Sequence, residues 1–202
     1  MHKSAFLALF GLLALTAQPA LAQSAPPQTK LVGVVAAMSG RELDLTAADG
    51  GKLVVLLDDK TRVVLSMPIS IDEIKPGSFV GAGAMVDGKG GNTAVEITVF
   101  PESARGLGEG FRKWDQGPNS TMTNGTVSQV VGTSNRTLTV TYKGGQQSVT
   151  IPDGTPIATF ASADASALQV GAHVVVRARK GGDGTLTAGF ITVGKDGSVP
   201  PG

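Results

Sequence analysis

The clearest structural signal in this sequence is GTVSQVVGTSNRTLTVTYKGGQQSVTI, residues 125–151. Apolar and polar residues alternate in it, most regularly through Leu138-Thr139-Val140-Thr141. A period of two is typical of a strand that buries one face and leaves the other in water. The segment therefore predicts three short strands, over residues 125–131, 137–142 and 147–151.

The same pattern occurs earlier in the chain. An offset of 94 residues aligns identical residues: Gly51 with Gly145, Asp59 with Asp153, Thr61 with Thr155, Gly77 with Gly171, and Ile97 with Ile191. Ordered matches of this kind indicate an internal repeat. We predict two homologous modules, over residues 29–102 and 123–195.

Each module is predicted to hold three strands, one short helix and a closing hairpin. Ser70-Ile71-Asp72-Glu73 has the spacing of a capping box, which starts a helix, and Pro76-Gly77 stops it. Its counterpart in the second module is an alanine-rich turn at residues 162–168. The remaining predicted strands are 31–37, 42–46, 52–57, 78–84 and 93–99 in the first module, and 172–178 and 186–193 in the second.

This order of elements predicts an all-β protein of two tandem small barrels, each with five to six strands and one short helix. A five-stranded Greek-key barrel of the OB type fits the order best. An SH3-like barrel is the alternative, because periodicity does not separate the two topologies.

The module pattern resembles a bacterial family of small secreted domains of unknown function, the domain of unknown function 5666 group. The second module carries the resemblance through Gly125-Thr126-Val127, Leu138-Thr139-Val140, the Leu168 to Val174 stretch and the Thr187 to Ile191 stretch. The first module matches more loosely. The resemblance implies a periplasmic protein with tandem β modules, and it implies no particular chemistry.

The N-terminus has the three parts of a secretory signal. His2 and Lys3 precede an apolar run of about eleven residues, and Ala20-Leu21-Ala22 offers a small-x-small cleavage site. We predict a signal peptide over residues 1–22, a mobile leader over 23–28, and a disordered Gly/Pro-rich tail over 196–202. The mature protein is then expected in the periplasm, without a membrane span. A chain without cysteine has no residue for a lipoprotein anchor and no disulfide.

Charge and aromatic content argue against nucleic acid as a partner. Removal of Lys3 with the signal leaves 16 of the 17 basic residues against 16 acidic ones, a formal net charge of zero. Nucleic-acid binding usually needs a basic surface, and single strands need aromatic stacking platforms. Only seven aromatic residues follow the signal: Phe79, Phe100, Phe111, Trp114, Tyr142, Phe160 and Phe190.

The segment between the modules, residues 103–122, is the predicted place for binding. It is rich in glycine and carries paired charges beside two of the aromatic residues. Loops of this kind often hold binding residues. The candidate binding residues are Arg105, Glu109, Phe111, Arg112, Trp114 and Asp115. The alternative is structural: Phe111 and Trp114 fill the gap between the two modules, with the charges in water around them.

Neither a catalytic nor a metal-binding signature is present in the sequence. Nucleophilic catalysis needs an activated serine, cysteine or threonine beside a base, and zinc or copper needs several His, Cys or carboxylate ligands. His173 is the only histidine after the signal. The carboxylates of Asp58-Asp59 and Asp72-Glu73 are adjacent and would face opposite ways on a strand. We therefore predict no catalytic residue, no metal site and no cofactor.

These observations predict a non-enzymatic periplasmic binding or protein-interaction protein. Its expected partner is another periplasmic or envelope protein. The alternative is a small-ligand or divalent-cation binder that uses a barrel mouth or the aspartates of glycine-rich turns. Those aspartates are Asp49, Asp87, Asp183 and Asp196.

Overall fold

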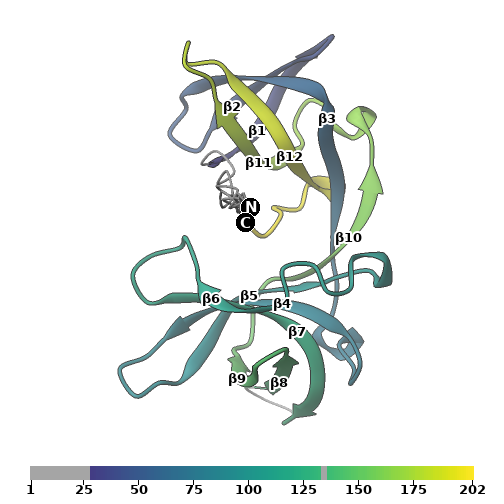
Figure 1. The fold of residues 1–202 in the computed structure, drawn as a ribbon. Helices are drawn as coiled ribbons and strands as arrows, with labels where there is room; N and C mark the ends of the chain where they lie inside the picture. The colour runs from purple at the N-terminus through teal and green to yellow at the C-terminus, as the bar shows by residue number, and fades with distance from the viewer. Residues whose placement is uncertain (1–27, 133–135) are drawn as a thin grey trace, which may run out of the picture.

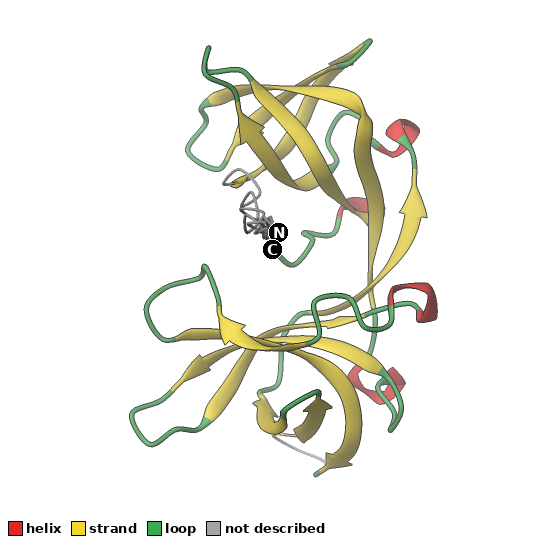
Figure 2. Ribbon diagram, viewed as in Figure 1, coloured by secondary structure: helices red, strands yellow, loops and turns green. Residues whose placement is uncertain are grey.

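The computed structural model describes residues 28–132 and 136–202. The predicted signal peptide and residues 23–27 of the predicted leader lie outside this part. The described chain is all-β, with short 3-10 turns at its periphery (Figures 1 and 2). Its strands are β1 (Gln28–Ser39), β2 (Glu42–Ala47), β3 (Lys52–Pro68), β4 (Phe79–Val86), β5 (Asn92–Val99), β6 (Gly110–Lys113), β7 (Ser120–Val131), β8 (Arg136–Tyr142), β9 (Gly145–Ile151), β10 (Ile157–Ala163), β11 (His173–Lys180) and β12 (Leu186–Gly194). Its 3-10 helices are η1 (Ile71–Glu73), η2 (Glu102–Ala104), η3 (Ala165–Ala167) and η4 (Lys195–Gly197).

Five strands close into a small barrel, here called the barrel lobe. Strands β1, β2 and β3 form an antiparallel meander, β11 pairs with β1, and β12 pairs with β11. The parallel pairing of β12 with β3, from Thr187 opposite Leu56 to Gly194 opposite Ser66, completes the ring. Bulges in β1 after Val35 and in β12 at Gly189 add the coiling that so narrow a barrel needs.

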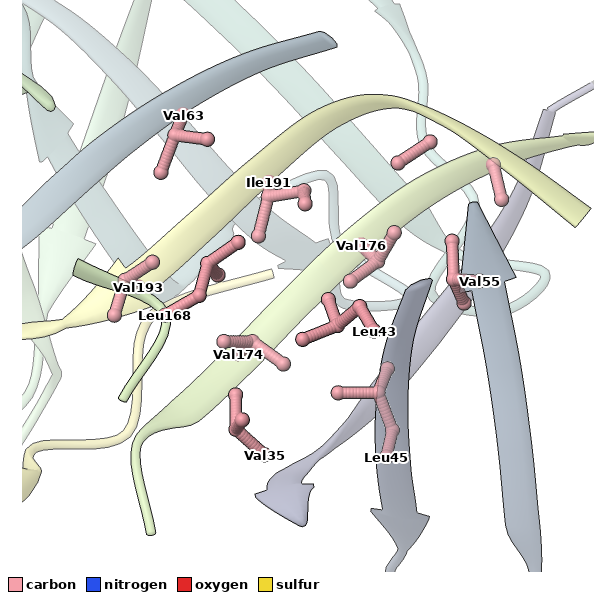
Figure 3. Packing of buried hydrophobic residues seen from close by; sticks show 12 residues of the cluster. Val35, Leu43, Leu45, Val55, Val63, Leu168, Val174, Val176, Ile191 and Val193 are labelled. Carbon is pink, nitrogen blue, oxygen red and sulfur yellow. The ribbon is translucent and has the colours of Figure 1, made fainter. Parts of the chain in front are cut away.

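The barrel interior is filled by aliphatic side chains of moderate size (Figure 3). Leu43, Leu45 and Val55 from β2 and β3 meet Val174 and Ile191 from the opposite strands. These side chains have almost no exposed surface, so each gains about 1.5–3 kcal/mol from burial. Leucine, valine and isoleucine fit this narrow interior, and no aromatic ring belongs to the buried cluster.

The other strands, β4 to β9, form a second lobe with its own apolar core. Its strand order is β5-β4-β7-β8-β9, and β6 adds to the first half of β7. Asn92 and Thr93 of β5 pair in parallel with Val149 and Thr150 of β9. The core is again aliphatic and includes Val80, Ile97, Val127, Leu138, Val140 and Val149.

Strand pairing does not follow the predicted module boundaries. The barrel lobe combines β1, β2 and β3 of the first predicted module with β11 and β12 of the second. The second lobe combines β4 and β5 of the first with β7, β8 and β9 of the second. The two halves of the chain therefore exchange their closing hairpins, and each apolar core is shared between them (Figure 1).

The exchange places equivalent residues in equivalent contacts. In the barrel lobe, Val35 donates to the carbonyl of Ala172 and accepts from the amide of Gly171. In the second lobe, Val127 exchanges the same pair of hydrogen bonds with Ser78 and Gly77. A Cβ on Gly33 would lie 2.7 Å from a carbonyl oxygen of the neighbouring strand, and one on Gly125 would lie 2.4 Å from such an oxygen. Both positions thus need glycine because two backbones approach closely there.

The long strand β3 and the shorter strand β10 carry the chain between the lobes (Figure 1). The sequence predicted that the third strand ends at residue 57, whereas β3 continues to Pro68. The second half of β3 pairs antiparallel with β10, from Val63 opposite Ala163 to Pro68 opposite Ala158. Strand β10 was not predicted, and it also pairs in parallel with β5. Pairing on both edges explains why this alanine-containing segment is a strand.

The ends of the predicted elements also differ at the leader and the tail. Gln28, the last residue of the predicted leader, begins β1. The tail, predicted as disordered, forms η4 and then runs into the space between the lobes, where Pro200 is buried (Figure 1). In the described part of the chain, no helix has the length and apolar character needed to cross a membrane.

Candidate functional site

A cavity of about 440 Å³ lies between the two lobes. Strands β3, β11 and β12 line it from the barrel lobe, and β4, β5 and β7 line it from the second lobe. Strand β10, part of the segment between the predicted modules, and the C-terminal residues Pro201 and Gly202 complete the wall. We call this cavity and the hollow that adjoins it the inter-lobe cleft. A volume of this size is typical of small-molecule sites.

Positive charge and aromatic rings converge on the cavity. Arg62 of β3, Arg112 of β6 and Arg177 of β11 line it, with Glu96 of β5 as the carboxylate. Among the described residues, neither Arg62 nor Arg112 forms an ion pair. The rings are contributed by Phe100, Phe160 and Phe190. An apolar group that ends in an anion is the chemistry that such a wall complements.

A second hollow of about 380 Å³ adjoins the cavity and contains Trp114 in its wall. Its other lining residues are mostly aliphatic, including Val32 of β1 and Val95 of β5, which are 44% and 40% exposed. Gly83 of β4 lies against the indole, because a Cβ there would be 2.6 Å from a ring carbon of Trp114. The ring therefore packs against a strand that has no side chain at this point.

Glu96 stands at the boundary between the cavity and the hollow. It lines both, and its carboxylate accepts a hydrogen bond from the amide of Gly202 at 2.9 Å. Burial raises the pKa of Glu96, and the Asp115 charge adds to that effect. The Gly202 amide and the charges of Lys30 and Arg177 oppose it.

Three of the six predicted binding residues lie at the cleft. Arg112 lines the cavity and donates to the carbonyl of Gly108 at 2.9 Å. Trp114 lines the hollow, and Asp115 forms an ion pair with Arg177 across 3.5 Å. This ion pair joins the segment between the predicted modules to β11 of the barrel lobe.

The other three predicted binding residues line neither the cavity nor the hollow. Arg105 pairs with Glu102, donates to the carbonyl of Gly77 at 2.9 Å, and lies over the ring of Phe79. Glu109 accepts from the backbone amide of Lys143 at 2.9 Å. Phe111 is 44% exposed and lines neither cavity nor hollow.

Three aspartates of the glycine-rich turns stabilise the turns in which they lie. Asp49, Asp87 and Asp183 each accept backbone hydrogen bonds within the same hairpin tip. The backbone donors lower the pKa of Asp87 and of Asp183. Within residues 28–132 and 136–202, no three His, Cys, Asp or Glu side chains gather in a way that could hold a metal ion. His173 begins β11, where it pairs with Val34.

The carboxylates within each adjacent doublet take separate partners, in β3 for Asp58-Asp59 and in η1 for Asp72-Glu73. Asp58 pairs with Arg179, whereas Asp59 pairs with Arg41. Asp72 pairs with Arg136, whereas Glu73 caps the amide of Ser70. Neither doublet directs two carboxylates at one point.

No family model, curated protein or solved structure matches this chain. The cleft must therefore be interpreted from its own residues. Sequence reasoning missed Lys30, Arg62, Glu96 and Arg177, which lie on four different strands. None of the four belongs to either apolar core of the described chain. Only the exchange of hairpins brings their strands together.

Proposed function

We propose that this chain is a non-enzymatic periplasmic protein that binds another envelope protein through the inter-lobe cleft. In this proposal the two lobes are a pair of OB-like barrels that arose from the internal repeat. The observation that carries the proposal is the convergence of two arginines, which form no ion pair among the described residues, and three phenylalanines on a cavity walled by both lobes, with Trp114 in the adjoining hollow. Arginine and tryptophan are the residues that most often anchor protein interfaces.

The periplasmic location rests on the predicted signal peptide and on the resemblance to a family of secreted bacterial domains. A chain without cysteine gains no disulfide in that compartment. Its stability then depends on its two aliphatic cores, which together hold 24 buried side chains.

Site-specific photo-crosslinking in intact cells tests the proposal. A photoreactive amino acid is placed at Arg112, which lines the cleft, or at Val131, which is 50% exposed at the end of β7. We expect a discrete adduct from position 112 and none from position 131. An exported, folded protein that gives no adduct at position 112, or equal adducts at both positions, would contradict the proposal.

A small-ligand function is the second candidate, and the volume of the cavity favours it. The ligand would be an anionic amphiphile, with its charge toward Arg62 and Arg112 and its apolar part toward the phenylalanines. Ligands that bind only the folded state raise the melting temperature. We expect such a rise with a panel of fatty acids and alkyl phosphates, and its loss in Arg62→Glu/Arg112→Glu. Lys89→Glu, at the exposed tip between β4 and β5, is the matched control.

A further inference from the structure

Residues 198–202, here called the docked tail, run from η4 into the inter-lobe cleft (Figure 1). Ser198 has φ −66° and ψ 151°, which is polyproline II geometry. The chain folds back closely at this point, since a Cβ on Gly194 would lie 1.7 Å from the carbonyl oxygen of Ser198. Pro200 is buried, whereas Val199 is 64% exposed.

Side chains from both lobes hold the backbone of the docked tail. The amide of Gly202 donates to Glu96 of β5 at 2.9 Å. Its carbonyl oxygen accepts from Lys30 Nζ of β1 at 2.9 Å and from Gln116 Nε2 at 2.7 Å. These contacts involve backbone atoms of Gly202, and a Cβ there would lie 3.2 Å from both Lys30 and Val175, so an extended segment with a small residue at this position satisfies them best.

The hollow beside these hydrogen bonds to Gly202 suits a proline ring. Pro200 and Trp114 line the same hollow, together with the aliphatic side chains of Val32, Val95 and Val175. Aromatic grooves recognise polyproline II segments because the proline ring is rigid and loses little entropy on binding. About 380 Å³ beside Pro200 and about 440 Å³ beside Pro201 are left unfilled by the tail. A longer or bulkier segment than the tail would therefore fit.

We propose that the inter-lobe cleft is a binding site for an extended, proline-containing segment of another protein, and that the docked tail is its tethered competitor. This inference rests on the proposed protein-binding function and names the class of partner. A tail held by a short tether competes for the cleft at an effective concentration of about 1 mM. A partner segment must therefore bind tightly enough to displace the tail.

Peptide binding to full-length, signal-free variants tests the inference. Pro200→Asp/Pro201→Asp removes the apolar part of the tail, and Val199→Asp is the control because that side chain points into solvent. The probe is a fluorescein-labelled, C-terminally amidated SVPPG peptide. We expect it to bind Pro200→Asp/Pro201→Asp at least about ten-fold more tightly than wild type, because the tethered competitor is gone. Val199→Asp is expected to behave as wild type, and an SVAAG peptide is expected to bind about ten-fold more weakly.

Equal binding of the probe to wild type and to Pro200→Asp/Pro201→Asp, or no binding to either, would overturn the inference. If that variant does not fold, the wild-type protein still gives a decision. Unlabelled SVPPG at about 1 mM should move the amide resonance of Gly202 toward its unfolded position, and an unmoved resonance counts against the inference. Should the peptide fail while position 112 still crosslinks an envelope protein, the proposed function stands and only the peptide class is wrong. Failure of both removes the proposed function as well.

Discussion

Glycine occupies the positions of β4 that face aromatic rings. Gly81 lies against Phe100, and Gly83 lies against Trp114, the one tryptophan in the sequence. We expect Gly83→Ala to push the indole outward, which costs about 1–3 kcal/mol of unfolding free energy and shifts the emission of Trp114 to the red. Denaturant unfolding followed by fluorescence measures both effects.

Gly88→Ala is the matched control for this substitution. A Cβ at Gly88 meets nothing within 4 Å, and its backbone is outside the left-handed region. We expect a change in stability within about 0.5 kcal/mol and an unchanged emission maximum. The packing of Trp114 on β4 would be disproved by a Gly83→Ala protein with the wild-type spectrum and stability.

Glu96 gives the protein a pH dependence of definite sign. Burial raises its pKa above the ordinary value of 4.5, so the folded state holds this proton more tightly than the unfolded state does. The charged form therefore costs stability above the folded pKa, and this cost is relieved as the pH falls toward 4.5. Glutamine at position 96 has no such dependence. We expect the stability of wild type relative to Glu96→Gln to fall as the pH rises from 4.5 to 7.

Urea unfolding of both proteins across this range measures the difference. The groups that face Glu96 are Lys30, Arg177 and Asp115, together with the Gly202 amide. A relative stability that rises with pH would mean that the two cations outweigh burial. The turn carboxylates Asp87 and Asp183 act in the opposite direction in both proteins. Their lowered pKa values provide stability that is lost as the pH falls below about 3.9, so they cancel in the comparison.

Part of the candidate site could be predicted residue by residue. A tryptophan and an arginine in a glycine-rich segment are unusual for a simple linker. Arg112 and Trp114 do line the cleft, and Asp115 reaches it through its ion pair with Arg177. Arg105 and Glu109 come from the same segment, and nothing in the sequence distinguishes them from the residues that reach the cleft. They line neither the cavity nor the hollow, because their side chains bind the Gly77 carbonyl and the Lys143 amide instead.

At the scale of elements, the capping box at η1 was predicted from four residues and is confirmed. Ser70 Oγ accepts from the amide of Asp72 at 3.2 Å, and Glu73 accepts from the amide of Ser70 at 2.8 Å. We expect Ser70→Ala to lower the unfolding free energy by about 1 kcal/mol, because an amide loses its acceptor. Ser103→Ala in η2, a turn with no side-chain cap, is the control and should be near neutral. Equal effects of the two substitutions in thermal melts would show that the cap does not contribute.

Most strands could also be predicted, because each buries one face against an aliphatic core and keeps the period of two. Two of the segments that were missed, β10 and the second half of β3, have both edges paired, whereas the missed β6 pairs with β7 alone in the described part of the chain. Strand β10 reads as alanine-rich and weakly helical, but it forms ladders with β3 and β5 at once. The second half of β3 lies between β10 and β12 in the same way. Tertiary hydrogen bonds outweigh local preference at these places.

At the scale of the whole molecule, the repeat pattern predicts which strands exist. It does not predict whether a closing hairpin completes the sheet of its own module or that of the other module. Equivalent strands carry equivalent residues, so a hairpin fits the opposite half of the chain as well as its own. Val35 with Ala172 and Val127 with Ser78 make the same bonds. The lobe that each hairpin completes depends on the length of chain that connects the two lobes. Continuous β3 carries the chain directly from the barrel lobe to the second lobe, and the hairpin of β4 and β5 therefore follows there.

The exchange of hairpins leads to a prediction about fragments. Residues 28–102 contain the first predicted module, yet three of their strands belong to one lobe and two to the other. Alone, this fragment and residues 107–202 should each lack a complete core, so we expect neither to unfold cooperatively in denaturant. Mixed at equal concentration, they should form a one-to-one complex with the circular dichroism spectrum of the intact protein.

Light scattering and denaturant melts of each fragment and of the mixture measure these outcomes. Two separately folded fragments that do not associate would show that each half completes its own barrel. The control is the full chain, which is folded first and then cut at Leu107. This residue is 61% exposed and lies between β5 and β6 in the sequence. Its two pieces start from the native pairing, so they should stay together after cleavage, since each lobe holds strands from both. Dissociation of the two pieces after this cut would contradict the exchange of hairpins directly.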